Sequence, residues 1–183
     1  MTKTNVRFLF VTGALVGALS FASSRPALAG IDLGGLANKA EGAASGKATE
    51  EVLKKANAKL MDVVRKNQCS FKSDSDELEA GCEKKALNIV KTLGDVKKQL
   101  TAAGIKKFKF EVSGHTDTSG KPEHNKELSG KRAAAIVKEL TARGVAADEI
   151  VSVGMGSEKP LVSPDNTEAK KKKNRRYEIQ VRI

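Results

Sequence analysis

The stretch KFKFEVSGHTDTSG, residues 107–120, decides the fold of this 183-residue chain. Phe108, Phe110 and Val112 alternate with charged residues, and a period of two residues is typical of a strand with one buried face. The strand runs directly into a polar loop that contains Asp117 and ends at Gly120. The sequence therefore predicts a strand that places a carboxylate in the loop behind it.

Helical spacing follows this loop and predicts a helix that ends at Gly144. Its apolar positions are Leu128, Ala133, Ile136, Val137 and Leu140. A short strand is expected over residues 150–155, and an alternating stretch over residues 177–183 predicts a last strand. The connection between them carries the basic run Lys170 to Lys173, which either meets an anionic polymer or is a solvated loop.

Upstream of the quoted stretch, residues 68–72 predict a first strand and residues 74–81 a polar turn. Apolar positions between Ala86 and Leu100 predict another helix, which stops at Gly104. The order strand, helix, strand, helix, strand, strand predicts an α+β domain of two layers. We expect a mixed four-stranded βαβαββ sheet with its helices on one face.

The N-terminal part predicts export. Residues 1–29 combine basic residues, an apolar run and the small-x-small site that ends at Ala29, as a secretory signal peptide does. A retained membrane anchor is the alternative. Residues 30–46 are rich in Gly and Ala and predict a flexible leader. An amphipathic helix from Thr49 to Lys66 then either packs on the domain or docks a partner. The predicted division is 1–29, 30–67 and 68–183.

The chain is basic, with 33 Lys and Arg residues against 22 Asp and Glu residues. In an exported protein this charge favours anionic polymers or acidic lipids over nucleic acid, although a solvated surface has the same composition. Cys69 and Cys82 are the two cysteines. A disulfide between them would close a loop of about 14 residues and stabilise the fold by roughly 3 kcal/mol; two separate buried thiols are the alternative. Two cysteines and two histidines are too few to predict a metal site or cofactor.

Asp117 and Arg132 carry the site chemistry. Arg132 borders the apolar side of its helix, four residues after Leu128, and a desolvated guanidinium requires a partner. In a strand-loop-helix unit the loop and the first helical turns lie close together, so Asp117 and Arg132 are expected to face one cleft. They form either an internal ion pair or two opposite charges spaced to hold a zwitterionic ligand.

Several motifs in order resemble one known family. The stretch VSGHTD, residues 112–117, is followed by Gly120, Asn125, Leu128-Ser129, Arg132-Ala133 and Asn174-Arg175-Arg176. This ordered set resembles the OmpA-like C-terminal domain, which also occurs in the peptidoglycan-associated lipoprotein and in the periplasmic domain of MotB. The resemblance covers roughly residues 68–183.

The resemblance implies non-covalent binding of peptidoglycan through the diaminopimelate of its stem peptide. The family's loop aspartate and helix arginine correspond to Asp117 and Arg132. Asn125 resembles a pocket asparagine, with an N-cap role as the alternative, and Thr116 either contacts the ligand or shapes the turn. Arg175 and Arg176 each either hold a carboxylate or brace the loop. His115 is expected to be structural.

The expected function is a periplasmic peptidoglycan-binding module, not an enzyme, located in the periplasm or at the outer membrane. No nucleophile with its base and no catalytic carboxylate pair accompanies Asp117. One alternative is an adaptor that docks an envelope protein partner through the Thr49–Lys66 helix. The other is a stator-like inner-membrane anchor with an uncleaved signal. The sequence leaves membrane association open.

Overall fold

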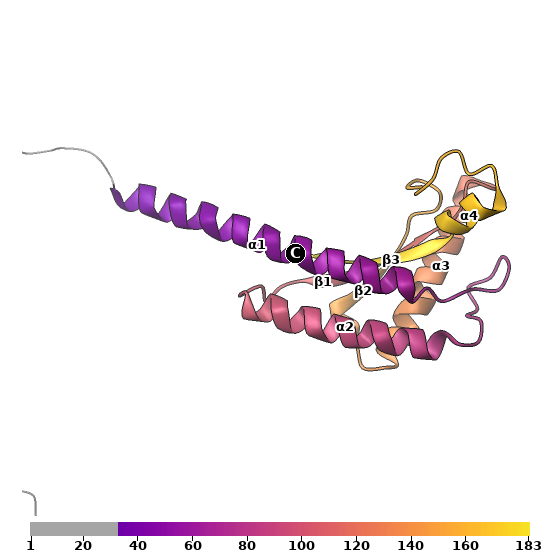
Figure 1. Ribbon diagram of the computed structural model, residues 1–183, viewed down its shortest axis with the longest axis horizontal. Coiled ribbons are helices and arrows are strands. Elements are labelled where there is room, and N and C mark those ends of the chain that lie inside the picture. The colour runs from indigo at the N-terminus through magenta and orange to yellow at the C-terminus, as the bar shows by residue number, and fades with distance from the viewer. Residues whose placement is uncertain (1–32) are drawn as a thin grey trace, which may run out of the picture.

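The computed structural model describes residues 33–183, and their side chains from residue 46 onward (Figure 1). The predicted signal peptide, residues 1–29, lies outside the described residues. The elements in chain order are α1 (Leu33–Lys66), α2 (Cys82–Ala102), β1 (Lys109–His115), α3 (Pro122–Thr141), η1 (Ala147–Glu149), β2 (Ile150–Gly154), α4 (Glu168–Asn174) and β3 (Arg176–Arg182).

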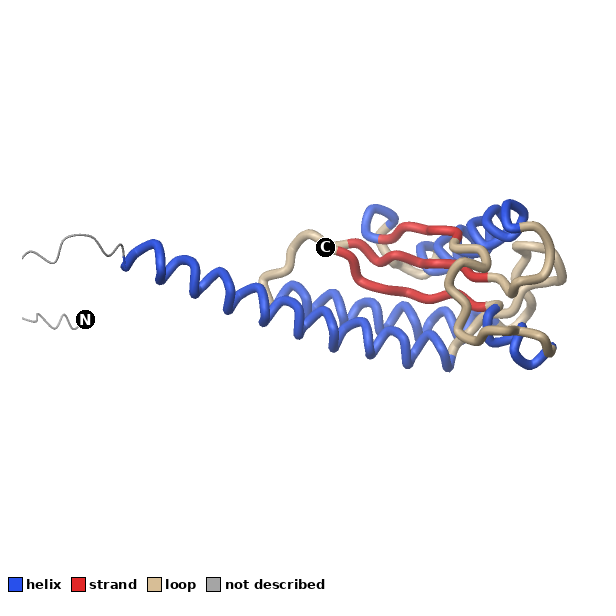
Figure 2. The backbone as a smooth tube through the Cα atoms, turned by 90° about the horizontal axis from the view of Figure 1, so that it is seen from above, coloured by secondary structure: helices blue, strands red, loops and turns tan. Residues whose placement is uncertain are grey.

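The sheet has the order β2-β1-β3, with β1 parallel to β2 and antiparallel to β3. Figure 2 shows its strands side by side. Phe110 pairs with Ile150 on one side and with Val181 on the other. Val112 pairs with Ile179. All five side chains are buried, so alternation in each strand lines up apolar rows on one face. The predicted α+β class with a mixed sheet is confirmed.

The helices complete a single core. α3 is the crossover between the parallel strands β1 and β2 and contacts both of them, α1 contacts β3, and α2 contacts α1 and α3. The buried apolar residues of α2 belong to the same cluster as the strand residues. The arrangement places the loop after β1 beside the first turns of α3, as the strand-loop-helix pattern predicts.

The prediction of a fourth strand at residues 68–72 is wrong. Only an isolated bridge between Phe71 and Leu78 forms there, and the sheet of the described chain has three strands. Side chains of Asn57 in α1 and of Gln68, the second residue after its end, bond to backbone groups of β3 instead. The Gln68 amide donates to the Tyr177 carbonyl at 2.9 Å and accepts from the Tyr177 N–H at 3.2 Å. The Val181 N–H donates to Asn57 Oδ1 at 2.7 Å. Because α1 runs along this edge, no strand pairs with it.

Helix α1 is longer than predicted. It begins at Leu33, so most of the segment predicted as a flexible leader is helical, and it ends at Lys66 as expected. Its second half packs on the domain through Ala56, Leu60 and Val64, which are buried. Extending a helix by further turns costs little free energy once packing has nucleated the helix, and the alanines of this segment favour the helical conformation. The first half projects past the sheet (Figures 1 and 2).

The basic run also differs from the prediction of a loop. Lys170 to Lys173 lie in the short helix α4, whose N-cap Thr167 accepts a hydrogen bond from the Lys170 N–H. A threonine at the N-cap followed by Glu168 in the first turn is a favourable helix start. Across residues 33–183, no helix has both the length and the apolar character needed to cross a membrane.

Candidate binding site

The loop after β1 and the adjoining turns of α3 form one wall of a groove of about 1740 Å³. All six residues that the sequence assigned to ligand binding line it: Thr116, Asp117, Asn125, Arg132, Arg175 and Arg176. Residues 68–74 line it as well, together with the end of α4 and part of α1. The structure therefore brings the predicted residues together, although each has a different set of partners.

Asp117 is buried and ionised. Its Oδ2 accepts from Arg175 Nη1 at 2.8 Å and its Oδ1 accepts from the Ser119 N–H at 2.9 Å. Burial raises the pKa of this carboxyl, but the hydrogen bonds from Arg175 and Ser119 outweigh it, so the pKa lies below its usual value. The carboxylate that lines the groove is therefore negatively charged at neutral pH.

Arg132 is partly buried and has no carboxylate within salt-bridge distance among the described residues. Its Nε donates to the Ser75 carbonyl at 2.8 Å and its Nη2 donates to the Lys72 carbonyl at 3.4 Å. The guanidinium carbon lies 5.2 Å from the centre of the Phe71 ring. Burial lowers the pKa of Arg132 and the charge of Asp74 opposes this shift, yet an arginine stays charged in proteins. The internal pair with Asp117, one of the two arrangements that the sequence left open, is therefore not formed.

Arg175 and Arg176 both have internal partners. Arg175 bridges Asp117 and Glu168, and these two bonds raise its pKa although burial opposes them. Arg176 Nε donates to Glu178 Oε1 at 2.7 Å, and its other nitrogens donate to two backbone carbonyls of the 159–174 connection. Both arginines thus brace the polypeptide around the groove, and Arg175 also holds the Asp117 carboxylate in place.

Asn125 and Thr116 shape the loop. Asn125 is buried, and its Nδ2 donates to the carbonyl of Ser119 at 2.8 Å and to that of Asp117 at 3.4 Å. Lys121 is the N-cap of α3, so the alternative N-cap role of Asn125 is wrong. The Thr116 N–H donates to the Gly156 carbonyl at 2.9 Å. Its hydroxyl is buried without a hydrogen-bond partner in the described chain.

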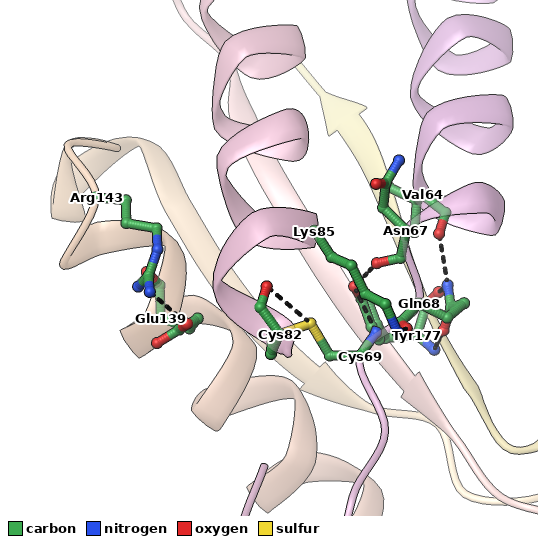
Figure 3. The surroundings of a disulfide bond; sticks show 9 residues. All are labelled: Val64, Asn67, Gln68, Cys69, Cys82, Lys85, Glu139, Arg143 and Tyr177. Carbon is green, nitrogen blue, oxygen red and sulfur yellow. Dashed lines mark hydrogen bonds and ion pairs between the residues drawn. A yellow bond between two sulfur atoms is a disulfide. The ribbon is translucent and has the colours of Figure 1, made fainter. Parts of the chain in front are cut away.

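Sequence reasoning missed two groups of positioning residues. Phe71 and the carbonyls of Lys72 and Ser75 hold Arg132, and they lie between the cysteines, which are bonded at 2.03 Å as predicted (Figure 3). Asp165 accepts from both the N–H and the hydroxyl of Thr118 and from Asn174 Nδ2. These bonds lower its pKa to about 2. The two cysteines, which enclose Phe71 in the sequence, were the available signal for the first group, whereas the second group had no such signal.

The fold and the groove define a small α+β domain, in which a strand-loop-helix unit presents an aspartate and an arginine that do not pair with each other. The chain belongs to the OmpA family, whose pattern matches residues 70–175. The resemblance seen in the motifs is therefore confirmed.

Similar proteins include envelope proteins. The chain is 39% identical over 92 residues to outer membrane porin F of Pseudomonas fluorescens, which is 50% of this chain and 26% of that protein. It is 44% identical over 70 residues to the peptidoglycan-binding protein ArfA of Mycobacterium tuberculosis H37Rv, covering 38% and 21%. It is 44% identical over 68 residues to the peptidoglycan-associated lipoprotein of Pasteurella multocida, covering 37% and 45%. The matches thus span less than half of these relatives.

Solved structures share the fold. The peptidoglycan-associated lipoprotein from Burkholderia pseudomallei superposes with a TM-score of 0.52 at 25% identity, over 63% of this chain and 89% of that one. The periplasmic domain of Helicobacter pylori MotB gives a TM-score of 0.52 at 23% identity, over 62% and 69%. The second likeness concerns the fold alone.

Proposed function

We propose that this chain binds peptidoglycan non-covalently and helps to anchor or organise the cell envelope. The observation that carries the proposal is that Asp117 and Arg132 line one groove as charged groups without pairing with each other. Kinship with proteins named for peptidoglycan binding or association supports it. We place this role in the periplasm, as a binding function and not a catalytic one.

The ligand contact that we propose is the diaminopimelate side-chain terminus, which carries an ammonium and a carboxylate. Arg132 uses Nε and Nη2 on backbone carbonyls, so the remaining N–H groups of its fork can donate to the ligand carboxylate. Asp117 accepts from Arg175 and Ser119, and a carboxylate has about four lone-pair sites, so one remains for the ligand ammonium. A pair of opposite charges at a fixed separation selects a zwitterion over a simple ion.

The affinity for one ligand is expected to be modest. Each charge-assisted hydrogen bond contributes about 1.5–3 kcal/mol net, and association costs offset much of this. Tight retention on the wall would come from many sites on one polymer that hold several copies of the protein.

Sedimentation with purified sacculi tests the assignment. Asp117→Asn and Arg132→Gln each remove one charge, and we expect each to weaken binding by about tenfold or more, the loss of one charge-assisted contact. Asp148→Asn and Arg143→Gln are matched controls, because both residues lie outside the groove and Asp148 is exposed. Equal sedimentation of all five proteins would remove the assigned site.

Two kinds of sacculi test the diaminopimelate contact. Walls whose stem peptides carry lysine in place of diaminopimelate lack the carboxylate of that terminus, so they should bind the wild-type protein weakly. On these walls Arg132→Gln should bind as well as the wild type, because the carboxylate that Arg132 would contact is absent. Equal binding of wild-type protein to both kinds of wall would reject the diaminopimelate assignment. It would leave peptidoglycan binding in place.

The adaptor alternative places partner docking on the helix from Thr49 to Lys66, which is the second half of α1. Truncation before Gln68 is unsuitable as a test, because it would remove Ala56, Leu60 and Val64 from the core. Reversing two exposed charges of this helix, with Lys55→Glu and Asp62→Lys, keeps these residues and lies outside the groove. If this variant recovers the same partners from envelope extracts as the unchanged chain, the adaptor role fails.

A further inference from the structure

The two cysteines close a segment that forms part of the groove wall. Residues 69–82, here called the disulfide loop, begin and end at the buried Cys69 and Cys82 (Figure 3). Cys69 is also tied to β3, since its N–H donates to the Tyr177 hydroxyl at 3.3 Å. Cys82 is the first residue of α2. The bridge therefore fixes both ends of the disulfide loop to the core of the domain.

Backbone hydrogen bonds carry this constraint from the bridge to the tip of the loop. The Glu79 N–H donates to the Ser70 carbonyl at 3.0 Å, and the Lys72 N–H donates to the Glu77 carbonyl at 3.0 Å. The tip is closed by the Ser75 N–H, which donates to the Lys72 carbonyl at 3.2 Å. Paired in this way, the two sides of the loop form a narrow hairpin. Because the disulfide fixes the two ends of this hairpin, it also fixes the positions of the Lys72 and Ser75 carbonyls at the tip.

Those two carbonyls are the hydrogen-bond acceptors of Arg132. The guanidinium lies over the ring of Phe71, a third member of the same loop. A second tie joins the loop to α3, because His124 Nε2 and Asp74 Oδ1 lie 2.9 Å apart. The described contacts of the guanidinium thus come from the disulfide loop, which is more than fifty positions away in sequence.

We propose that the Cys69–Cys82 bridge, acting through the disulfide loop, positions the Arg132 guanidinium for its ligand. A chain without the bridge then binds the ligand more weakly than the bridged chain. This inference deepens the proposed function and rests on it. Phe71 is a positioning residue in the same arrangement, because its ring supports the plane of the guanidinium.

The physical reason is preorganisation. An arginine side chain has several rotatable bonds, and a binding site gains affinity when its groups are already held in the bound geometry. Without the bridge the loop carbonyls no longer have fixed positions, and the guanidinium can turn toward the nearby charges of Asp74 and Asp117. A direct pair with Asp117 would neutralise both groups that the ligand needs.

The first measurement follows the Nε–H of Arg132 by NMR and needs no ligand. The resonance is assigned by its absence from Arg132→Lys. In bridged wild-type protein we expect a shift distinct from that of free arginine and slow exchange with water. In Cys69→Ala/Cys82→Ala we expect the shift to move to the free-arginine position, with exchange at least about tenfold faster, as a lost hydrogen bond of this kind allows.

The control is Leu93→Ala, which lowers stability from the buried core of α2 and lies outside the groove. It should leave the Arg132 resonance unchanged, which separates positioning from general destabilisation. An unchanged resonance in the cysteine variant, or an equal change in Leu93→Ala, would overturn the inference.

The second measurement is a titration with free diaminopimelate. We expect affinity to fall about tenfold in Cys69→Ala/Cys82→Ala, less in Phe71→Leu, and to change by under about twofold in Leu93→Ala. Unchanged affinity in the cysteine variant overturns the positioning role. Failure of the wild-type protein to bind sacculi or diaminopimelate is a different result, because it rejects the proposed function, while the Arg132 resonance still decides whether the bridge positions the guanidinium.

Discussion

Gly114 of β1 lies so close to Ser129 of α3 that a Cβ atom on the glycine would overlap the Ser129 carbonyl oxygen. This contact sets the distance between the strand that leads to Asp117 and the helix that carries Arg132. A second glycine, Gly154 in β2, meets the backbone of Gly130 in the same way, with a Cβ atom only 2.7 Å from the Gly130 nitrogen. The groove therefore depends on two strands that approach α3 without side chains between them.

Gly114→Ala should destabilise the domain by about 3 kcal/mol, because the clash is with backbone that has no other place to move. The free energy of unfolding in urea measures it. Gly94→Ala is the control: Gly94 lies in α2 with nothing within 4 Å of its added Cβ, so the same change should stabilise by about 0.5–1 kcal/mol. A neutral Gly114→Ala would show that strand and helix separate easily.

Gln68→Glu should destabilise by about 1–3 kcal/mol, since a carboxylate cannot donate to the Tyr177 carbonyl at the sheet edge or to the Val64 carbonyl. The variant keeps the acceptor for the Tyr177 N–H, so it isolates the lost donor. Urea unfolding provides the measurement, with the exposed Gln99→Glu of α2 as the matched control. If both variants lose the same stability, the side-chain pairing of β3 contributes little.

From the lowered pKa of Asp165 we predict that the free energy of unfolding decreases at acid pH. Hydrogen bonds from Thr118 and Asn174 lower its pKa to about 2, below the value of about 3.9 in an unfolded chain. The unfolded state therefore binds the proton more readily, so these bonds stabilise the fold above pH 4, and this stabilisation is lost as the pH falls through about 2. Asp165→Asn should be less stable than wild type at pH 7, with a difference that shrinks in acid. A difference that stays constant from pH 6 to pH 2 contradicts this assignment, and Asp148→Asn serves as the exposed control.

From the lowered pKa of His115 we predict a second dependence of stability on pH, over a higher range of pH. Burial, with smaller effects of the positive charges of Arg176 and Lys159, lowers the pKa of its imidazole to about 4, although Glu178 opposes this shift. Because the unfolded histidine has a pKa of about 6.5, stability is full above that pH and declines as the pH falls toward 4. NMR titration should give a midpoint near 4 for the signal that disappears in His115→Asn. A midpoint near 6.5 would mean that water reaches the ring.

Local pattern predicted much of the fold. The alternation of Phe108, Phe110 and Val112 indicated a strand, and the helical spacing after it indicated α3, because each pattern records which face of one element is buried. The absence of a strand at residues 68–72 could not be predicted from such a pattern. Gln68 supplies its side-chain amide to the edge of β3 where a backbone strand was expected, and nothing in a short polar stretch distinguishes the two.

The candidate site, too, could be predicted only where its residues are close together in the sequence. That Asp117 and Arg132 share a groove could be inferred, since the strand, the loop and the helix are consecutive. The ion pair of Asp117 with Arg175 could not be inferred, because these residues are 58 positions apart and only folding brings the end of α4 to the loop. The hold of Phe71 and Ser75 on Arg132 is hidden from sequence for the same reason.

The sequence by itself determined the order of the buried strands and helices, the two cysteines able to bridge, and the carboxylate in the loop after β1. Only the tertiary structure decided which charge meets which partner and what covers the edge of β3. The physical reason is range: burial patterns repeat within one element and can be seen along the chain, whereas hydrogen bonds and ion pairs act over a few ångströms between segments that only folding brings together.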